Sequence, residues 1–501
     1  MAVLPVKRVV IVGGGTAGWM TAAVLSCAMG ERLEIRVVES ESIGIVGVGE
    51  ATIPQIRHVN RFLGIDEDAM LRATGGTFKL AIQFNDWLRI GHSYLHAFGD
   101  VGLPLGLLPF QHYWLRGGTG AADLWSYSLN AAAAGEGRMA RIEQVGRSPI
   151  SGIKYAFHLD AALYGQVLRA YAEKHRVRRT EGTVVDVGLR GEDGYIEAVR
   201  LESGERIEGD LFIDCSGFRA LLIEGALRCG FDDWRDWLPC DRALAVPSEP
   251  VAPMRPYTQA NARPAGWQWR IPLQHRTGNG HVYSSEFMSE DEATAILLRS
   301  LDGRALGDPR RIAFNAGARQ KFWSRNCVAI GLAAGFLEPL ESTAIHLIQS
   351  GVNRLLTLFP DRGFDPALSE EYNRKTREEY EQVRDFLVLH YRTTERRDTP
   401  FWRRCGALPA PASLQRKLDL FRSSGQIFRE GEELFAEPSW LQVMIGQGVL
   451  PGRHHPIADE LPREKLDEFL GTIRALIRGA VERMDGHERF IAQHCAAAPN
   501  A

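Results

Sequence analysis

The feature that most constrains the fold is a strand, a glycine-rich turn, a helix and a second strand at the start of the chain. Arg8–Val12 is an apolar, β-branched run typical of a buried parallel strand. A G-x-G-x-x-G motif follows at once over residues 13–18, and a helix is predicted over Trp19–Met29. A second predicted strand, Leu33–Val38, ends at the acidic Glu39. In this order the features form a dinucleotide-binding fingerprint.

Each part of the fingerprint has a physical task. The first glycine permits a tight turn, the second lets backbone N–H groups approach a pyrophosphate, and the third allows the helix to pack closely on the strand. Glu39 is placed to accept a hydrogen bond from a ribose hydroxyl. A glycine turn alone is weak evidence, but its setting favours a nucleotide site over a structural turn. The predicted contacts of the turn are Gly13, Gly15, Thr16, Ala17 and Gly18.

Charge and cysteine usage exclude several classes of protein. The formal net charge of the 501 residues is −3, which argues against a nucleic-acid or anionic-membrane partner. No apolar run is long enough to predict a membrane span, and glycines interrupt the apolar N-terminus, so we do not expect a signal peptide. The seven cysteines are scattered and suggest reduced thiols in a cytoplasm, with no metal site.

Three later segments are predicted to return to the nucleotide. The glycine-rich loop over residues 43–54 favours a cofactor-lining loop over an ordinary turn, and Val184 lies on a strand placed to reach an adenine ring. The strand over residues 210–214 ends in a small-residue turn, as a chain returning to the nucleotide requires. The remaining predicted cofactor contacts are Val48, Gly49, Ala51, Leu332 and Ile345.

The residues with potential chemistry each have a structural alternative. Lys79 lies in an apolar run, where a lysine is usually an edge residue whose amine reaches solvent. The aromatic residues 110–114 suit a pocket or a core equally. Alternation places Trp267 and Trp269 on one side of a strand that Pro272 ends, which by itself indicates a half-buried strand.

A helix predicted over Ala344–Phe359 has an N-terminus suited to an anion. Ser342 and Thr343 are candidate caps, and the unpaired N–H groups of the first turn form a ready anion site. Glu341 just outside the helix either balances the helix dipole or has a catalytic role, and the pattern leaves both open.

The order of elements predicts an α/β fold with a mostly helical C-terminal module. We expect an FAD-binding module over residues 1–360, with substrate-pocket segments interleaved at about 75–150 and 240–320, and a helical module over 361–501. In the last module a helix is predicted over Ser369–Tyr391 with Ser369 as its cap.

Several motifs in order resemble the flavin-dependent tryptophan halogenase family over nearly the whole chain. They are G-G-G-T-A-G-W at 13–19, G-V-G-E-A-T at 47–52, Lys79, W-Q-W-R-I-P at 267–272 and F-L-E-P-L-E-S-T at 336–343. W-x-W-x-I-P is the most specific of them. The resemblance implies a Rossmann-like flavin monooxygenase fold that binds FAD.

The resemblance also implies a two-step chemistry. FADH₂ from a separate flavin reductase reacts with O₂ to give a flavin hydroperoxide, which oxidises chloride or bromide to hypohalous acid. This oxidant passes through an internal tunnel to Lys79, at the family's lysine position, which delivers it to a small aromatic substrate. Electrophilic aromatic substitution follows.

Further roles follow from the resemblance alone. Glu341 matches the glutamate that polarises the oxidant and takes the ring proton, while Thr343 and Ala344 match the halide site. The tryptophans of the W-x-W-x-I-P motif are implied to keep substrate away from the flavin. The implied substrate pocket contains His96, Phe98, Phe110, Trp267, Trp269 and Ser342.

Departures from the family pattern bear on the substrate. Ala344 replaces the usual glycine, and no acid follows Gly331. The aromatic segment that clamps an amino acid has no clear counterpart, Trp440 being the nearest feature. We therefore expect free indole or an indole derivative in preference to tryptophan as the substrate. We also expect the protein to be a monomer or a homodimer. The alternatives are a flavin-dependent aromatic monooxygenase and a non-catalytic flavin-binding protein.

Overall fold

The predicted dinucleotide-binding unit is present in the computed structural model, which describes residues 4–41, 49–118 and 121–498. A six-stranded sheet has the order β21-β22-β13-β1-β2-β9, and its inner strand β1 runs parallel to both neighbours. Every residue of β1 after Arg8 is buried, as its apolar run predicts. The strands are β1 (Arg8–Val12), β2 (Glu34–Glu39), β9 (Arg178–Glu181), β13 (Leu211–Asp214), β21 (Trp323–Ser324) and β22 (Cys327–Ala329).

Three helices assemble beside this sheet. α1 (Thr16–Met29) follows the glycine turn and packs against both α6 (Ala161–Lys174) and α8 (Ala344–Thr357). α8 begins where the sequence predicts and ends two residues earlier than expected. Thr343 is its N-cap by position, but no side chain caps the helix, so the capping role predicted for Ser342 and Thr343 is wrong.

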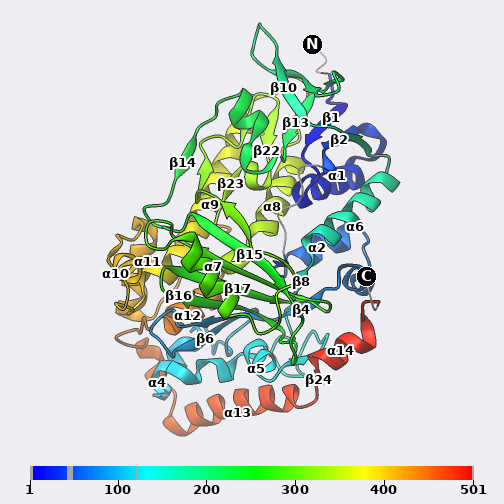
Figure 1. Ribbon diagram of the computed structural model, residues 1–501. Helices are drawn as coiled ribbons and strands as arrows, with labels where there is room; N and C mark the ends of the chain where they lie inside the picture. Colours follow the sequence, from blue (N-terminus) through cyan, green and yellow to red (C-terminus); the bar gives the residue numbers. More distant parts are fainter. Residues whose placement is uncertain (1–3, 42–48, 119–120, 499–501) are drawn as a thin grey trace.

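A second, seven-stranded sheet lies below this unit in Figure 1. Its order is β19-β15-β18-β17-β16-β5-β6, in which only β16 and β5 pair in parallel. Segments far apart in the chain therefore share one sheet. Its strands are β5 (Ala81–Asn85), β6 (Ser93–Ala97), β15 (Arg242–Ser248), β16 (Tyr257–Arg263), β17 (Gly266–Pro272), β18 (Thr277–Tyr283) and β19 (Arg310–Ala313).

β17 carries the W-x-W-x-I-P motif and is more buried than its alternation predicts. Trp267, Trp269 and Ile271 are buried, but so is Gln268, which points to the other face and is 4% exposed. Gln268 is covered because its amide oxygen accepts hydrogen bonds from Arg263 and from the Ser300 hydroxyl. The expectation of a half-buried strand is therefore wrong.

The remaining strands form small sheets that link these parts. β8 pairs with both β3 and β4 and so brings the loop after the nucleotide unit next to Lys79. Their bounds are β3 (Glu50–Ala51), β4 (Thr77–Lys79) and β8 (Ala156–Leu159). The others are β7 (Arg138–Met139), β10 (Val184–Leu189), β11 (Ile196–Leu201), β12 (Arg206–Glu208), β14 (Phe231–Asp233), β20 (Gly317–Arg319), β23 (Gly335–Phe336) and β24 (Asp485–Gly486).

The chain after residue 365 is mostly helical, as predicted. α9 (Pro366–Arg392) begins before Ser369 because the Asp365 side chain caps it by accepting from Ala367 N–H, so the predicted cap is wrong. α13 (Arg463–Val481) packs on α4 (Phe110–Gly117) and α5 (Leu129–Gly135). The remaining helices are α2 (Ile56–Phe62), α3 (Glu67–Thr74), α7 (Glu290–Arg299), α10 (Pro400–Ala407), α11 (Ala412–Ser424), α12 (Glu437–Gly446) and α14 (His487–His494).

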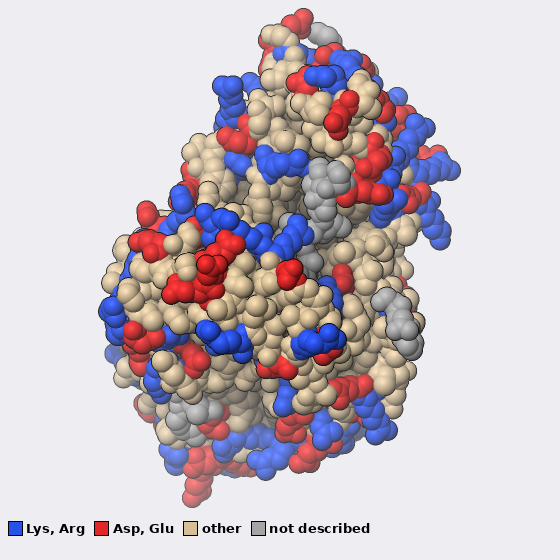
Figure 2. Space-filling view, viewed as in Figure 1, with Lys and Arg blue, Asp and Glu red and all other residues tan. Residues whose placement is uncertain are grey.

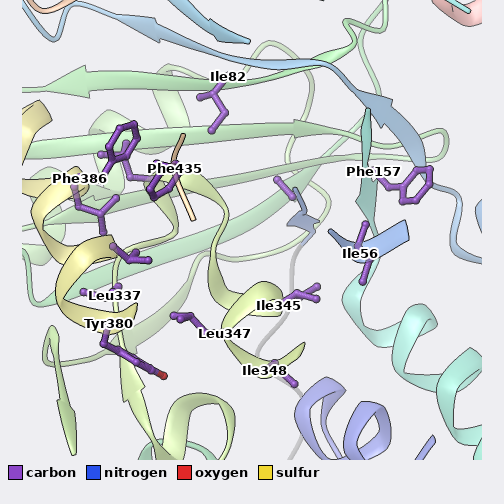
Figure 3. Packing of buried hydrophobic residues seen from close by; sticks show 14 of the residues in the cluster. Ile56, Ile82, Phe157, Leu337, Ile345, Leu347, Ile348, Tyr380, Phe386 and Phe435 are labelled. Atoms are coloured by element: carbon purple, nitrogen blue, oxygen red, sulfur yellow. The ribbon is translucent and has the colours of Figure 1, made fainter. Parts of the chain in front are cut away.

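One hydrophobic core joins these parts. Ile345, Leu347 and Ile348 of α8 belong to the same buried cluster as Tyr380 and Phe386 of α9. In Figure 3 Leu347 lies on the side of α8 that faces Tyr380, and Ile345 and Ile348 lie on its other side. On the face seen in Figure 2, Lys and Arg are interspersed with Asp and Glu. None of the helices in the described residues is both long and apolar enough to cross a membrane.

Candidate active site

A cavity of about 830 Å³ lies at the carboxyl ends of β1 and β2. It extends from Glu39 and Val184 over the glycine turn to the N-terminus of α8. Most of the predicted cofactor contacts line it. These are Gly13, Gly15, Thr16, Ala17, Glu39, Val184, Leu332 and Ile345, together with Ala344 from the predicted halide site.

The three glycines of the motif serve different ends. A Cβ atom on Gly13, whose φ is +118°, would lie 2.1 Å from Cys215 O, and one on Gly18 would lie 1.8 Å from Gly13 O. Both glycines therefore allow backbone to approach backbone. A Cβ atom on Gly15 would meet no atom within 4 Å, although this residue lines the cavity. A side chain at Gly15 would project into the space that a pyrophosphate needs, so the turn fits a dinucleotide such as FAD.

The Glu39 side chain lines the cavity, but its carboxylate already accepts hydrogen bonds from other side chains. Its carboxylate accepts from Arg179 Nε, and from Trp19 Nε1 at 3.1 Å. Arg169 Nη1 lies 3.5 Å from the same carboxylate. The sequence pattern did not indicate the two arginines, because they lie 130 and 140 residues further along the chain. A carboxylate has enough acceptor sites to take a ribose hydroxyl as well.

The glycine-rich loop over residues 43–54 contributes fewer residues to the lining of the cofactor cavity than predicted. Gly49 packs near Gly278 and Ile271, and Ala51 pairs with His158 in a small sheet, so neither lines the cavity. Glu50 between them does line it, and burial raises the pKa of its carboxyl to about 7. The predicted contact Val48 lies outside the described residues.

Lys79 is fully buried, which contradicts the alternative of an edge residue with a solvated amine. Its Nζ donates to Ser342 Oγ at 2.7 Å and to Thr52 O at 3.1 Å, and it lies 5.3 Å from the centre of the Phe98 ring. Burial lowers the pKa of this amine to about 7, and Glu341 opposes the shift. Thr52 could not be selected as a partner from the sequence pattern, because it accepts through its backbone carbonyl.

The segment that carries Glu341 connects Lys79 with the cofactor cavity. Ser342 is in the left-handed region with φ +61°, and α8 begins two residues later at Ala344, which lines the cavity. Two residues span at most roughly 7 Å, so Lys79 lies close to the cofactor end of this segment. Ala344 is the first residue of a right-handed helix and has no positive φ, so an alanine in place of the glycine causes no backbone strain there.

Glu341 is buried between two histidines. Its Oε2 lies 2.8 Å from His96 Nδ1, and its Oε1 lies 3.0 Å from His390 Nε2. Burial raises the pKa of this carboxyl, but the two imidazoles outweigh it and lower the pKa to about 2. His96, which we placed in the substrate pocket, thus contacts the predicted base directly. His390 was not predicted, because it lies on α9 about 50 residues after Glu341 with no local motif.

Trp267 is held by a second buried carboxyl of the same segment. Its Nε1 donates to Glu338 Oε2 at 2.8 Å, and Tyr391 OH donates to the same atom at 2.6 Å. Burial raises the pKa of Glu338 to about 7, against these two hydrogen bonds. Trp269 packs over Gly280, where a Cβ atom would lie 2.0 Å from its ring. The sequence did not predict a role for Glu338 or Tyr391, although Glu338 lies in the F-L-E-P-L-E-S-T motif at 336–343.

The other predicted pocket residues divide into two groups. Phe98 faces Lys79, but Phe110 lines a separate cavity of about 610 Å³ and packs against Tyr127. Trp440 is fully buried, with its ring edge-on to Phe386. In Figure 3 Phe386 lies beside Phe435, and their rings stack at 3.8 Å.

The second cavity lies next to the Lys79 wall. Asn130 lines it and donates through Nδ2 to the backbone oxygen of Leu80, the residue after Lys79. Among the described residues that line this cavity there is no lysine, arginine or histidine, and the charged ones are Asp100 and Glu437. The cavity is therefore mostly apolar and offers no cation to a ligand.

Comparison with known proteins matches this geometry to one family. The family model described as tryptophan halogenase matches residues 8–463. The tryptophan 6-halogenase SttH of Streptomyces toxytricini is 35% identical, over 97% of this chain and 98% of that protein. Among solved structures, the flavin-dependent halogenase Xcc4156 of Xanthomonas campestris has a TM-score of 0.95 and 48% identity, covering 99% of this chain and all of that one. BrvH of Brevundimonas sp. BAL3, also a flavin-dependent halogenase, has a TM-score of 0.94 and 46% identity, covering 97% and 99%.

Proposed function

Because the chain belongs to the tryptophan halogenase family and is a flavin-dependent halogenase, we propose that it halogenates an indole-type substrate that carries no carboxylate. Free indole or an indole derivative is favoured over tryptophan. Bound FAD, reduced by a separate flavin reductase, supplies the electrons with which O₂ converts chloride or bromide to hypohalous acid. The observation that carries the halogenation chemistry is the buried Lys79 held by Ser342 beside Glu341, and the substrate class rests on the lining of the second cavity.

Lys79 is suited to hold the oxidant. Its amine is enclosed, and with a pKa of about 7 it populates both the ammonium and the neutral amine at neutral pH. The ammonium donates a hydrogen bond to the oxygen of hypohalous acid, and the neutral amine can take the halogen as a haloamine. Either form keeps the electrophile next to Phe98, where an indole ring would stack.

Glu341 is suited to accept the ring proton. The aromatic carbon forms a bond to the halogen and then loses its proton, and the electrons of the C–H bond restore the aromatic ring. A carboxylate that stays ionised can take that proton. The halide is placed at the N-terminus of α8, where the N–H groups of Thr343 and Ala344 begin a helix and the dipole favours an anion.

The second cavity supports the substrate class. A tryptophan bound with its amino-acid end in this cavity would place a carboxylate where the described lining has only Asp100 and Glu437 as charged groups. The negative charges of Asp100 and Glu437 would repel that carboxylate, whereas a neutral side chain or an ammonium would meet no such repulsion. Trp440 cannot act as a clamp for the amino acid, because its ring is enclosed in the core.

The test is a substrate panel. The protein is incubated with FAD, a flavin reductase, NADH, and chloride or bromide, and with indole, tryptamine or tryptophan, and products are identified by mass spectrometry. We expect halogenated indole and tryptamine, and a kcat/KM for tryptophan at least about tenfold lower. Glu341→Gln is expected to lose about 10²-fold or more in halogenation while flavin oxidation continues.

Two outcomes would contradict the proposal. Tryptophan as the best substrate would refute the carboxylate-free class while leaving the halogenase activity intact. A hydroxylated product formed without halide would instead favour the monooxygenase alternative.

A further inference from the structure

The end of β6 connects two residues of the candidate site. Among the described residues, β6 pairs with a strand on one side only, that of β5, so it is an edge of the seven-stranded sheet. Ala97 is its last residue. The residue before it, His96, contacts Glu341. The residue after it, Phe98, faces Lys79. Any group that holds Ala97 therefore acts on both sides of the site at once.

Gln442 of α12 holds both backbone groups of Ala97. Its Oε1 accepts from Ala97 N–H at 3.1 Å, and its Nε2 donates to Ala97 O at 3.0 Å. A side-chain amide in this position takes the place of a neighbouring strand, because it offers one acceptor and one donor to the same residue. α12 lies beside β6 in Figure 1, and the Gln442 side chain is completely buried between them.

The orientation of this amide is fixed by its own helix. Nε2 also donates to Pro438 O at 3.1 Å, one turn earlier in α12. Turning the amide over would place its oxygen opposite two carbonyl oxygens and its nitrogen opposite the N–H of Ala97. Only one orientation satisfies all three backbone groups, so Gln442 connects α12 to the end of β6 in a single geometry.

Neighbouring contacts on the same edge do not replace Gln442. Trp125 Nε1 donates to Leu95 O, which holds the strand two residues before Ala97. Ala97 itself is 1% exposed, so without the glutamine its N–H and carbonyl would lose their partners in a site that water does not reach. Buried backbone groups without partners are costly, so the end of the strand would have to move.

The inner side of the strand end is fixed to the chain beside Lys79. Phe98 N–H donates at 2.9 Å to the backbone oxygen of Leu80, the residue after Lys79. Ala97 is thus held from outside by α12, and Phe98 is held from inside by the Lys79 segment. Together the two contacts set the point at which Phe98 leaves the strand.

We propose that Gln442 is a positioning residue that sets where the aromatic substrate lies relative to Lys79 and so determines which ring carbon is halogenated. This inference rests on the proposed function for the roles of Lys79 and Phe98. The contact between Gln442 and Ala97 does not depend on that function. The hydrogen bonds of Gln442 all go to backbone groups, so it acts through the end of β6 and not on the reacting atoms.

The effect on the product follows from the distances in the site. The centre of the Phe98 ring lies 5.3 Å from Lys79 Nζ, so an indole stacked on Phe98 lies beside this amine. Neighbouring carbons of an indole are one bond apart, so a small displacement of Phe98 brings a different carbon next to the electrophile. A misplacement of about 1 Å can also cost up to about 10²-fold in rate.

The first test is the ratio of product isomers formed by Gln442→Met. Methionine has a similar length and volume but cannot form the hydrogen bonds to Ala97. The variant and the wild type halogenate tryptamine, and the isomers are separated and quantified by liquid chromatography and mass spectrometry. We expect kcat/KM to fall about tenfold and the ratio of major to minor isomer to fall at least about threefold. This ratio does not depend on the amount of folded enzyme, so a variant that is only less stable keeps the wild-type value.

Asn326→Leu is the matched control. Asn326 is also buried and holds both backbone groups of one residue on another small sheet, because its Oδ1 accepts from Ile196 N–H at 2.9 Å and its Nδ2 donates to Ile196 O at 2.8 Å. Its loss should lower stability and leave the isomer ratio unchanged.

Several outcomes would overturn the inference. An unchanged isomer ratio in Gln442→Met, or the same change in Asn326→Leu, would show that the glutamine has a packing role only. Wild-type protein that does not halogenate tryptamine or indole would instead contradict the proposed function.

The second test needs neither activity nor a folded variant. Hydrogen exchange of the wild-type protein is followed by mass spectrometry on peptides that cover β6. We expect the Ala97 amide to exchange slowly, although β6 is an edge strand, because Gln442 accepts its hydrogen. An Ala97 amide that exchanges as fast as one in an unfolded chain would refute the proposal.

Discussion

Burial of Lys79 should make the stability of the protein depend on pH in a way that one substitution removes. The side chain is fully buried and its pKa is lowered from 10.5 to about 7 by desolvation. Between these values the unfolded chain holds a proton on this lysine and the folded protein does not. Stability contributed by this group therefore rises with pH through that window.

The magnitude follows from the two pKa values. The lowered pKa of Lys79 reduces the free energy of unfolding by about 4 kcal/mol at pH 7 and by about 1 kcal/mol at pH 10, because the folded protein must release the proton that the unfolded chain keeps. Lys79→Met keeps an unbranched chain of similar length without the charge. It also loses the hydrogen bonds to Ser342 and Thr52, but that loss does not depend on pH in this range. The free energy of unfolding of wild type should therefore rise by about 3 kcal/mol relative to the variant between pH 7 and pH 10.

The assay is urea unfolding of both proteins at the two pH values, followed by circular dichroism. Other groups titrate in this window as well, but they are common to both proteins and cancel in the difference. Lys154→Met, which removes an exposed lysine, controls for the loss of one amine. A difference between wild type and Lys79→Met that is the same at pH 7 and pH 10 would show that the amine is not desolvated.

Two further predictions concern the glycine turn and the tryptophan strand. Gly15→Val should lower FAD affinity at least about tenfold without lowering the stability of the apo-protein, whereas Gly18→Val should prevent folding because its Cβ would lie 1.8 Å from Gly13 O. FAD affinity is measured by fluorescence titration and stability by thermal unfolding. Equal effects of the two substitutions would contradict the separate roles of the two glycines. Trp267→Phe removes a donor from Glu338 and should destabilise the protein by about 1–3 kcal/mol in urea unfolding. An unchanged midpoint would mean that the hydrogen bond contributes nothing.

The parts of the fold that were predictable are those set by local sequence. The strand before Gly13, the turn and α1 follow from an apolar run, three glycines and helical periodicity, all within 30 residues. The same holds for α13, whose apolar residues repeat at helical spacing. The start of α9 was missed by three residues because both Asp365 and Ser369 can cap a helix, and the pattern does not choose between them.

The environment of the candidate site was not predictable, because it is made by contacts between distant segments. The burial of Lys79 depends on Thr52 and Ser342, and Glu341 is enclosed between His96 and His390. No periodicity or spacing in the sequence links these positions. The same is true of Gln268 on β17: alternation predicts which face of the strand it is on, but not that residues such as Arg263 cover it there.

The segment from Glu338 to Ala344 explains why the site that holds the oxidant at Lys79 and the proposed halide site beside the cofactor cannot vary independently. Glu338 fixes the tryptophan strand, Glu341 meets the histidines, Ser342 holds Lys79, and Ala344 lines the cofactor cavity. All four lie within seven residues, and the left-handed φ of Ser342 sets the direction in which the chain leaves Glu341 and enters α8. A substitution that shifts this backbone would therefore disturb the oxidant-holding lysine and the halide site together. For this reason the variants that separate the steps are those at partner residues on other elements, such as His390, and not those within the segment.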